Sequence, residues 1–175
     1  KAGTSALGIA SIQIAKAIGC NVLTTVRDES LVEILRKLGA DKVYIDRDDN
    51  LFEKIMKDYP EGINKVLDLI GPKTVRESLK MCTKNGIVCS TGILGGEYEL
   101  NNFDPIKDIP NGVYLTGFYS NYPTQQTIDN IMDLINTKNI KPYIGKVYNF
   151  EDIALVHKNM EEHKVTGKSV VIIES

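Results

Sequence analysis

Apolar positions along this chain follow two alternating patterns. Residues 8–18 carry apolar side chains every three or four positions, which predicts a helix, and residues 21–26 form a run rich in Val, Leu and Thr, which predicts a strand. The same alternation continues to the end of the chain. Further helices are predicted over residues 28–38, 50–59, 73–82, 124–138 and 151–162. Further strands are predicted over residues 42–45, 65–70, 86–91, 113–118, 143–148 and 169–174.

This order of elements predicts the fold class, an α/β domain with a doubly wound parallel sheet of the Rossmann type. Strands joined by helical crossovers pair in parallel through right-handed connections. The run 65–70 is apolar except for Lys65 and Asp68, as expected of a strand covered by helices on both faces. Asn85-Gly86 predicts a turn, and the long loop 92–112 is typical of functional segments. Parallel sheets bind ligands at the carboxyl ends of their strands, so we expect the site there.

Composition narrows the classes of function. The chain has 175 residues, enough for one domain, and a net charge of −2, which does not favour nucleic acid as a partner. No apolar run reaches the roughly 18 residues of a membrane helix, and no signal peptide opens the chain. Three cysteines (Cys20, Cys82 and Cys89) are an odd number without a CxxC spacing, so we expect free thiols, a cytoplasmic location and no zinc site in this chain. The start at Lys1 suggests a piece of a longer protein.

The segment Gly3-Thr4-Ser5-Ala6-Leu7-Gly8 opens the first predicted helix. Its spacing is that of a dinucleotide-binding turn, in which small residues let the backbone approach a pyrophosphate. The free N–H groups and the positive dipole of a helix N-terminus favour phosphate. Ser5 replaces the usual middle Gly, and a plain tight turn is the alternative interpretation.

Arg27 lies at the end of the predicted strand 21–26. About 20 residues after such a turn, an NAD site places Asp or Glu on the ribose hydroxyl. A guanidinium at this position can instead pair with a 2′-phosphate, which favours NADP(H) over NAD(H). The alternative is a solvated arginine beside Asp28 and Glu29.

Several segments resemble the cofactor domain of the medium-chain dehydrogenase/reductase superfamily, most nearly its quinone oxidoreductase-like and zinc-type alcohol dehydrogenase-like members. The similarity covers the whole chain. The segments that carry it are Ser5–Gly8 with Gln13–Gly19, Leu38–Val43, Gly62–Gly71, Thr91–Gly96, Lys141-Pro142 and Thr166–Lys168. The resemblance implies hydride transfer between NAD(P)H and a carbonyl or an activated C=C bond of a small-molecule substrate.

The resemblance also implies a set of cofactor contacts. Gly3 and Thr4 open the turn, Ser5, Ala6 and Leu7 would contact pyrophosphate, and Arg27 would meet the 2′-phosphate. Ile70 and Gly71 would lie near the adenine ribose, Thr91, Gly92 and Ile93 would flank the nicotinamide ribose, and Phe118 and Tyr119 would border the nicotinamide ring. Leu31 and Asp46 replace a Lys and a Tyr of many NADPH-using relatives, so the expected preference for NADP(H) depends mainly on Arg27.

Two parts that the resemblance implies are missing from the chain. One is an N-terminal substrate domain, which the C-terminal segment of residues 1–175 normally joins, and the fragment alone is expected to be inactive. The other is the first Rossmann strand, expected before Gly3; residues 170–173 are one candidate to fill its place in the sheet. The strand 113–118 is the expected edge of a homodimer, since relatives often pair it across a two-fold axis.

Other interpretations remain open from the residues alone. Tyr119 is the candidate catalytic proton donor, with simple packing as the alternative. A non-catalytic dinucleotide-binding or redox-sensing module is the second function, because Ser5, Leu31 and Asp46 depart from the family pattern. A methyltransferase-like domain is a third, although the first turn is poor in Gly and no acidic residue takes the place of Arg27.

Overall fold

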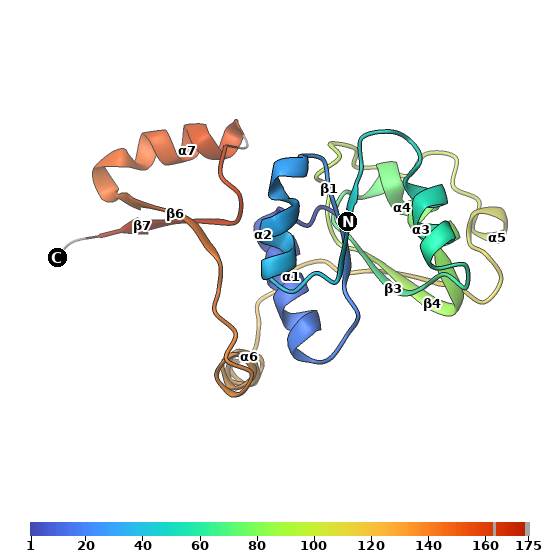
Figure 1. Ribbon diagram of the computed structural model, residues 1–175, viewed down its shortest axis with the longest axis horizontal. Coiled ribbons are helices and arrows are strands. Elements are labelled where there is room, and N and C mark those ends of the chain that lie inside the picture. Colours follow the sequence, from blue (N-terminus) through green and yellow to red (C-terminus); the bar gives the residue numbers. More distant parts are fainter. Residues whose placement is uncertain (163, 174–175) are drawn as a thin grey trace. The chain divides into compact units, whose positions relative to one another are not determined.

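A computed structural model describes residues 1–162 and 164–173, and its helices and strands alternate along the chain (Figure 1). The strands are β1 (Leu23–Val26), β2 (Lys42–Ile45), β3 (Ile63–Asp68), β4 (Cys82–Ser90), β5 (Tyr114–Gly117), β6 (Ile144–Asn149) and β7 (Lys168–Ile172). The α-helices are α1 (Ala6–Ala17), α2 (Val32–Lys37), α3 (Leu51–Asp58), α4 (Pro72–Lys80), α5 (Pro105–Asp108), α6 (Gln125–Thr137) and α7 (Ile153–Glu161). The 3-10 turns η1 (Glu29–Leu31) and η2 (Phe150–Asp152) precede α2 and α7.

The strands pair in parallel, which confirms the predicted α/β fold of the Rossmann type. The described strands form the sheets β1-β2, β3-β4-β5 and β6-β7. The strands of the second and third sheets run parallel to their neighbours. Crossover helices separate consecutive strands, as parallel pairing requires.

Local details differ from the sequence prediction in three places. β3 ends at Asp68, two residues early, because Ile70 and Gly71 turn into α4. The predicted turn Asn85-Gly86 lies inside β4, as an irregularity that offsets the pairing with β3 and puts Asn85 at a φ of 66°. The short helix α5 interrupts the predicted loop 92–112. The last residue of the predicted strand 169–174, Glu174, lies outside the described residues.

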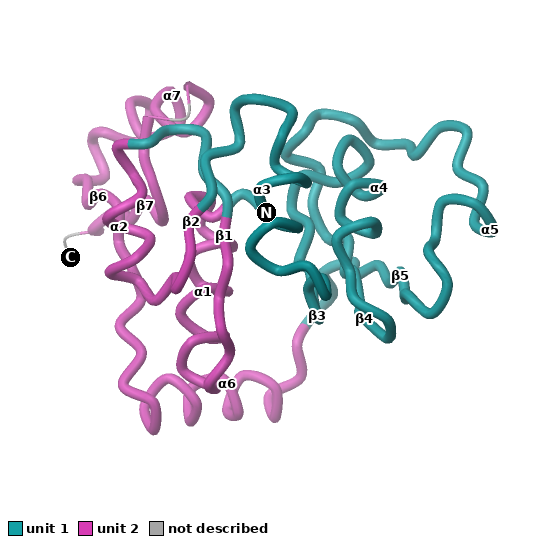
Figure 2. Tube along the Cα trace, turned by 45° about the vertical axis from the view of Figure 1, so that its right-hand side comes forward, with its two compact units in different colours: residues 1–2, 25–29, 44–122 teal, residues 3–24, 30–43, 123–175 magenta. Residues whose placement is uncertain are grey.

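The chain divides into two compact units (Figure 2). Unit 1 comprises residues 1–2, 25–29 and 44–122. Its core lies where α4 packs against β3 and β4. Val75, Leu79, Val88 and Val113 are buried together there.

Unit 2 comprises residues 3–24, 30–43 and 123–175. Helix α1 buries Ile9 and Ile12, and its Gln13 Nε2 donates to the Lys141 carbonyl at 2.7 Å. Asp41 ties α1 to the start of β1, because its carboxylate contacts Lys16 Nζ at 2.5 Å and accepts the Val22 N–H at 2.8 Å. Within the described residues, no helix has both the length and the apolar character needed to cross a membrane.

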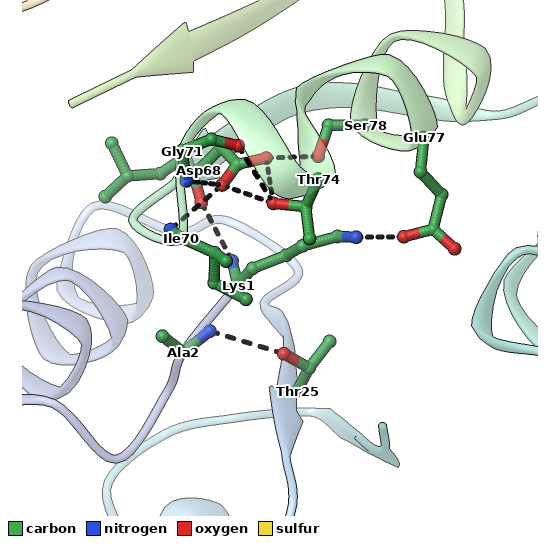
Figure 3. Close-up of polar contacts among 10 residues, drawn as sticks. Lys1, Ala2, Thr25, Asp68, Ile70, Gly71, Thr74, Glu77 and Ser78 are labelled. Atoms are coloured by element: carbon green, nitrogen blue, oxygen red, sulfur yellow. Dashed lines mark hydrogen bonds and ion pairs between the residues drawn. The ribbon is translucent and has the colours of Figure 1, made fainter. Parts of the chain in front are cut away.

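The hypothesis that residues 170–173 take the place of the missing first strand is wrong. Val170 and Val171 pair with Val147 and Tyr148 of β6, because the α7 crossover returns the chain beside β6. Within unit 1, the residues that lie between β3 and β1 are instead Lys1 and Ala2. The Lys1 amino group donates to the Leu67 carbonyl at 2.8 Å, and the Ala2 N–H donates to Thr25 Oγ1 at 3.3 Å (Figure 3).

Asp41 makes the stability of unit 2 sensitive to pH. The hydrogen bond from Lys16, with that from the Val22 N–H, lowers the pKa of Asp41 below its ordinary value of 3.8. A carboxyl whose pKa is lowered by folding stabilises above its unfolded pKa, and this contribution is lost as pH falls through the folded pKa. We expect Asp41→Asn to unfold at lower urea concentration than the wild type at pH 7.

The two midpoints should converge as pH falls below 3.8. Urea denaturation followed by circular dichroism from pH 7 to pH 3 measures both. Asp49→Asn, at an exposed position, is the matched control and should follow the wild-type curve. A constant gap between Asp41→Asn and the wild type over the whole range would contradict the prediction.

Candidate functional site

In unit 1, the parallel strands β3, β4 and β5 end side by side at their carboxyl ends. The register pairs Asp68 of β3 with Ser90 of β4, and Ser90 with Gly117 of β5. The segments that follow these residues therefore leave the sheet at one edge. They contain Ile70 and Gly71, Thr91, Gly92 and Ile93, and Phe118 and Tyr119. The structure thus brings the sequence-predicted residues of unit 1 that follow β3, β4 and β5 to the edge where ligands of such sheets bind.

Asp68 organises the turn from β3 into α4 (Figure 3). Its side chain is fully buried, and its Oδ1 accepts the N–H groups of Ile70 and Gly71, each at 3.0 Å. Thr74 Oγ1 lies 2.9 Å from both carboxylate oxygens, and Ser78 Oγ donates to Oδ2 at 2.6 Å. These donors satisfy the carboxylate, which a buried charge requires. The sequence marked Asp68 as the polar interruption of a strand, and its role in the turn becomes visible only from these contacts.

The turns after β3 and β4 are bonded to each other. The N–H groups of Thr91, Leu94 and Gly95 donate to the carbonyls of Asp68, Leu69 and Ile70 at 3.1, 3.1 and 2.9 Å. The two backbones approach so closely that a Cβ on Gly92 would clash with the Leu69 carbonyl oxygen. Only glycine fits in this space. The two segments predicted to contact the ribose groups, after β3 and after β4, are therefore held together by backbone hydrogen bonds.

The segment after β5 joins the same edge. Thr91 Oγ1 donates to the Phe118 carbonyl at 2.8 Å, and the Phe118 N–H donates to the Ser90 carbonyl at 3.2 Å. Phe118 and Tyr119 are 59% and 92% exposed, so neither residue is buried against the described part of the chain. Tyr119 forms no hydrogen bond with a described residue, and its proposed catalytic role has no further support in the geometry.

Arg76 anchors the long segment between β4 and β5, a contact that sequence reasoning missed. Its Nε lies 3.2 Å from Asp108 Oδ2, its Nη2 donates to the Asn101 carbonyl at 2.7 Å, and its guanidinium lies over the Phe103 ring. The Asp104 N–H and this guanidinium lower the pKa of Asp108. The loop therefore packs on α4 through one arginine, which no short-range motif signals.

Arg27 lies at the carboxyl end of β1, where the sequence predicted it. The Asp46 N–H donates to the Val26 carbonyl at 2.8 Å, so β1 and β2 end side by side. Arg47, which sequence reasoning missed, donates its Nε to the Arg27 carbonyl at 2.5 Å. Its position just beyond β2 matches that of Arg27 just beyond β1, a signal that the sequence contained.

In unit 2, the turn Gly3–Leu7 leads into α1. Ser5 is the helix N-cap, and its Oγ accepts the Gly8 N–H at 3.0 Å. The N–H groups of Ala6 and Leu7 form no hydrogen bond with a described residue, and free amides of this kind at a helix N-terminus fit an anionic group. The sequence predicts the tight bend at Gly3. The residue with a positive φ is instead the preceding Ala2, at 63°.

The described residues contain no group of three or more His, Cys, Asp or Glu side chains arranged to hold a metal ion. Cys20, Cys82 and Cys89 are all free. Burial raises the pKa of the Cys82 thiol to about 11, which disfavours the thiolate that zinc binds.

These observations define the class: a parallel α/β domain with a ligand edge at the carboxyl ends of its strands. Residues 6–137 match the model of the zinc-binding dehydrogenase family. The chain belongs to this family.

Individual relatives agree with the family match. The quinone oxidoreductase of Pongo abelii is 29% identical over 99% of this chain and 56% of its own length. The crystal structure of AibC has a TM-score of 0.85 at 22% identity, covering 99% of this chain and 48% of that one. A mycobacterial protein solved with NADPH has a TM-score of 0.79 at 23% identity, covering 98% of this chain and 55% of that one. The chain spans about half the length of the curated relatives it matches.

Replacing Asp68 tests whether its carboxylate holds the turn. In Asp68→Asn, an NH₂ group takes the place of one acceptor oxygen and meets N–H and O–H donors. Hydrogen bonds to a charged group contribute roughly 1.5–3 kcal/mol each, so we expect the free energy of unfolding to fall by about 2–3 kcal/mol. Urea denaturation measures it.

Ser78→Ala is the matched control, because it removes one donor to Asp68 and leaves the bonds from Ile70, Gly71 and Thr74. It should lower the free energy of unfolding by about 1.5 kcal/mol, less than Asp68→Asn, because only one of the bonds to the carboxylate is lost. Equal stability of Asp68→Asn and the wild type would show that the turn does not depend on the carboxylate.

Proposed function

We propose that this chain binds the nicotinamide dinucleotide of an oxidoreductase that transfers a hydride to a carbonyl or an activated C=C bond. The observation that carries the proposal is the edge of the sheet where β3, β4 and β5 end side by side. There the segments that follow the strands are hydrogen-bonded to one another, and Phe118 and Tyr119 remain exposed. Membership of the dehydrogenase family, a relative named quinone oxidoreductase and a neighbour solved with NADPH support it.

We propose the cofactor contacts that the family resemblance implies. We assign Ile70 and Gly71 to the adenine ribose, Thr91, Gly92 and Ile93 to the nicotinamide ribose, and Phe118 and Tyr119 to the nicotinamide ring. Gly3 to Leu7 are assigned to the pyrophosphate, because Ala6 and Leu7 offer free amides. The bound cofactor supplies the hydride, while the protein binds and orients it. Residues outside this chain are proposed to form the remaining walls of the substrate pocket.

The preference is proposed to be for NADP(H) over NAD(H). Arg27 is exposed at the end of β1, and its guanidinium forms no ion pair with a described carboxylate. A free guanidinium at this place matches a 2′-phosphate and offers nothing specific to a ribose hydroxyl.

Removing the Arg27 side chain should reveal this preference. Charge-assisted hydrogen bonds contribute roughly 1.5–3 kcal/mol, and 1.4 kcal/mol corresponds to tenfold in affinity. We therefore expect Arg27→Ala to weaken NADPH binding by about tenfold or more and to leave NADH binding within about twofold. Isothermal titration calorimetry of the intact protein with each nucleotide measures both.

Lys57→Ala, at an exposed position on α3, removes the same charge and is the matched control. It should bind both nucleotides like the wild type. If the wild type bound neither nucleotide, the proposed function would fail. If it bound NADH as tightly as NADPH, only the preference would fail.

We also propose that β5 pairs with a second copy of this chain. Among the described residues β5 pairs only with β4, and Tyr114 at its start is 59% exposed. An unpaired edge strand presents N–H and C=O groups to another chain. The Phe118 N–H donates to Ser90 of β4, so the preceding Gly117 N–H faces away from β4. Sedimentation velocity should show a dimer that Gly117→Pro converts to monomer, because proline removes this outward-facing N–H. A monomeric wild type would refute the pairing.

A further inference from the structure

Arg47 lies against Arg27, although 20 positions separate the two residues in the sequence. The bond between Arg47 Nε and the Arg27 carbonyl, 2.5 Å long, holds the two residues together at the adjoining ends of β1 and β2. This bond uses one nitrogen of the Arg47 guanidinium. The two terminal nitrogens form no hydrogen bond with a described residue, and neither arginine forms an ion pair with a described carboxylate. Two exposed arginines thus lie at the adjoining ends of β1 and β2, and no described carboxylate forms an ion pair with either.

We propose that Arg47 is a second ligand of the 2′-phosphate and a determinant of specificity for NADP(H). This inference rests on the proposed function, and it adds a residue that the sequence resemblance did not mark. A phosphate carrying about two negative charges at pH 7 accepts several charge-assisted hydrogen bonds, more than one guanidinium supplies. Because the Nε bond already orders the Arg47 side chain, less conformational entropy is lost when its terminal nitrogens bind phosphate.

The neighbouring acidic residues do not form ion pairs with Arg27 or Arg47. Asp48 and Asp49 are exposed, and within the described residues no ion pair joins Asp46, Asp48 or Asp49 to either arginine. These carboxylates disfavour an anion in general, so a bound phosphate needs both guanidiniums rather than Arg27 alone.

Two small probes isolate the 2′-phosphate from the rest of the cofactor. The first is 2′,5′-ADP, which carries it, and the second is 5′-AMP, which lacks it. Calorimetric titration of the intact wild-type protein should show tighter binding of 2′,5′-ADP. In Arg47→Ala, we expect binding of 2′,5′-ADP and NADPH to weaken by about tenfold, with 5′-AMP and NADH within about twofold. Lys57→Ala, which removes one exposed charge, should leave all four affinities within about twofold.

Arg47→Lys separates a specific contact from charge alone. Lysine keeps the positive charge but lacks the planar fork, so its affinity for 2′,5′-ADP should lie between those of Arg47→Ala and the wild type. Thermal unfolding of each variant checks that the fold is intact, as expected at an exposed position.

The outcomes distinguish the inference from the function on which it rests. Loss of 2′,5′-ADP affinity in Arg47→Ala, with 5′-AMP unaffected, supports it. Equal weakening of both probes, or of neither, overturns it while NADPH binding by the wild type leaves the proposed function intact. A wild-type protein that binds neither NADPH nor NADH overturns the proposed function and this inference with it.

Discussion

The buried carboxylate of Asp68 is the interaction on which the ligand edge depends. A charged group taken out of water must be hydrogen-bonded on every side, and here the donors come from the turn that it organises. The bonds from Ile70 and Gly71 fix the backbone after β3, and those from Thr74 and Ser78 fix the first two turns of α4. The start of the helix and the end of the strand are thereby held by one side chain.

The rest of the edge follows from that turn by backbone contacts. Once residues 69–71 are fixed, their carbonyls accept the N–H groups of the segment after β4, and Gly92 allows the close approach. Thr91 then holds the backbone at Phe118. Three segments that are distant in sequence are therefore ordered by hydrogen bonds that begin at one carboxylate. A preorganised edge of this kind binds a ligand without the cost of ordering loops on binding.

The arginines at the ends of β1 and β2 differ from Asp68 in that their charges are exposed and not buried. The Arg47 side chain is held by one bond to the Arg27 backbone carbonyl, and both arginines are exposed. Phosphate recognition favours this division, because an ion-paired guanidinium would have to break its partner's bonds before it bound an anion. The buried charge at Asp68 therefore stabilises the turn, while the exposed charges remain available for a ligand.

The sequence by itself determined the order of the elements, the Rossmann class and most of the positions at the ligand edge. These depend on local spacing: apolar periodicity, glycines at turns and Arg27 at a strand end are all visible within short windows. It also placed β2 at its observed bounds and most other elements within two residues.

Where the sequence prediction failed, contacts between distant residues decided the structure. Asn85 lies in a strand rather than a turn because β3 pairs around it, and residues 170–173 pair with β6 rather than with the central strands because α7 returns the chain there. The role of Asp68, the anchoring of the loop by Arg76 and the contact of Arg47 with Arg27 depend on the tertiary structure for the same reason: each joins groups that only the folded chain brings within hydrogen-bonding distance.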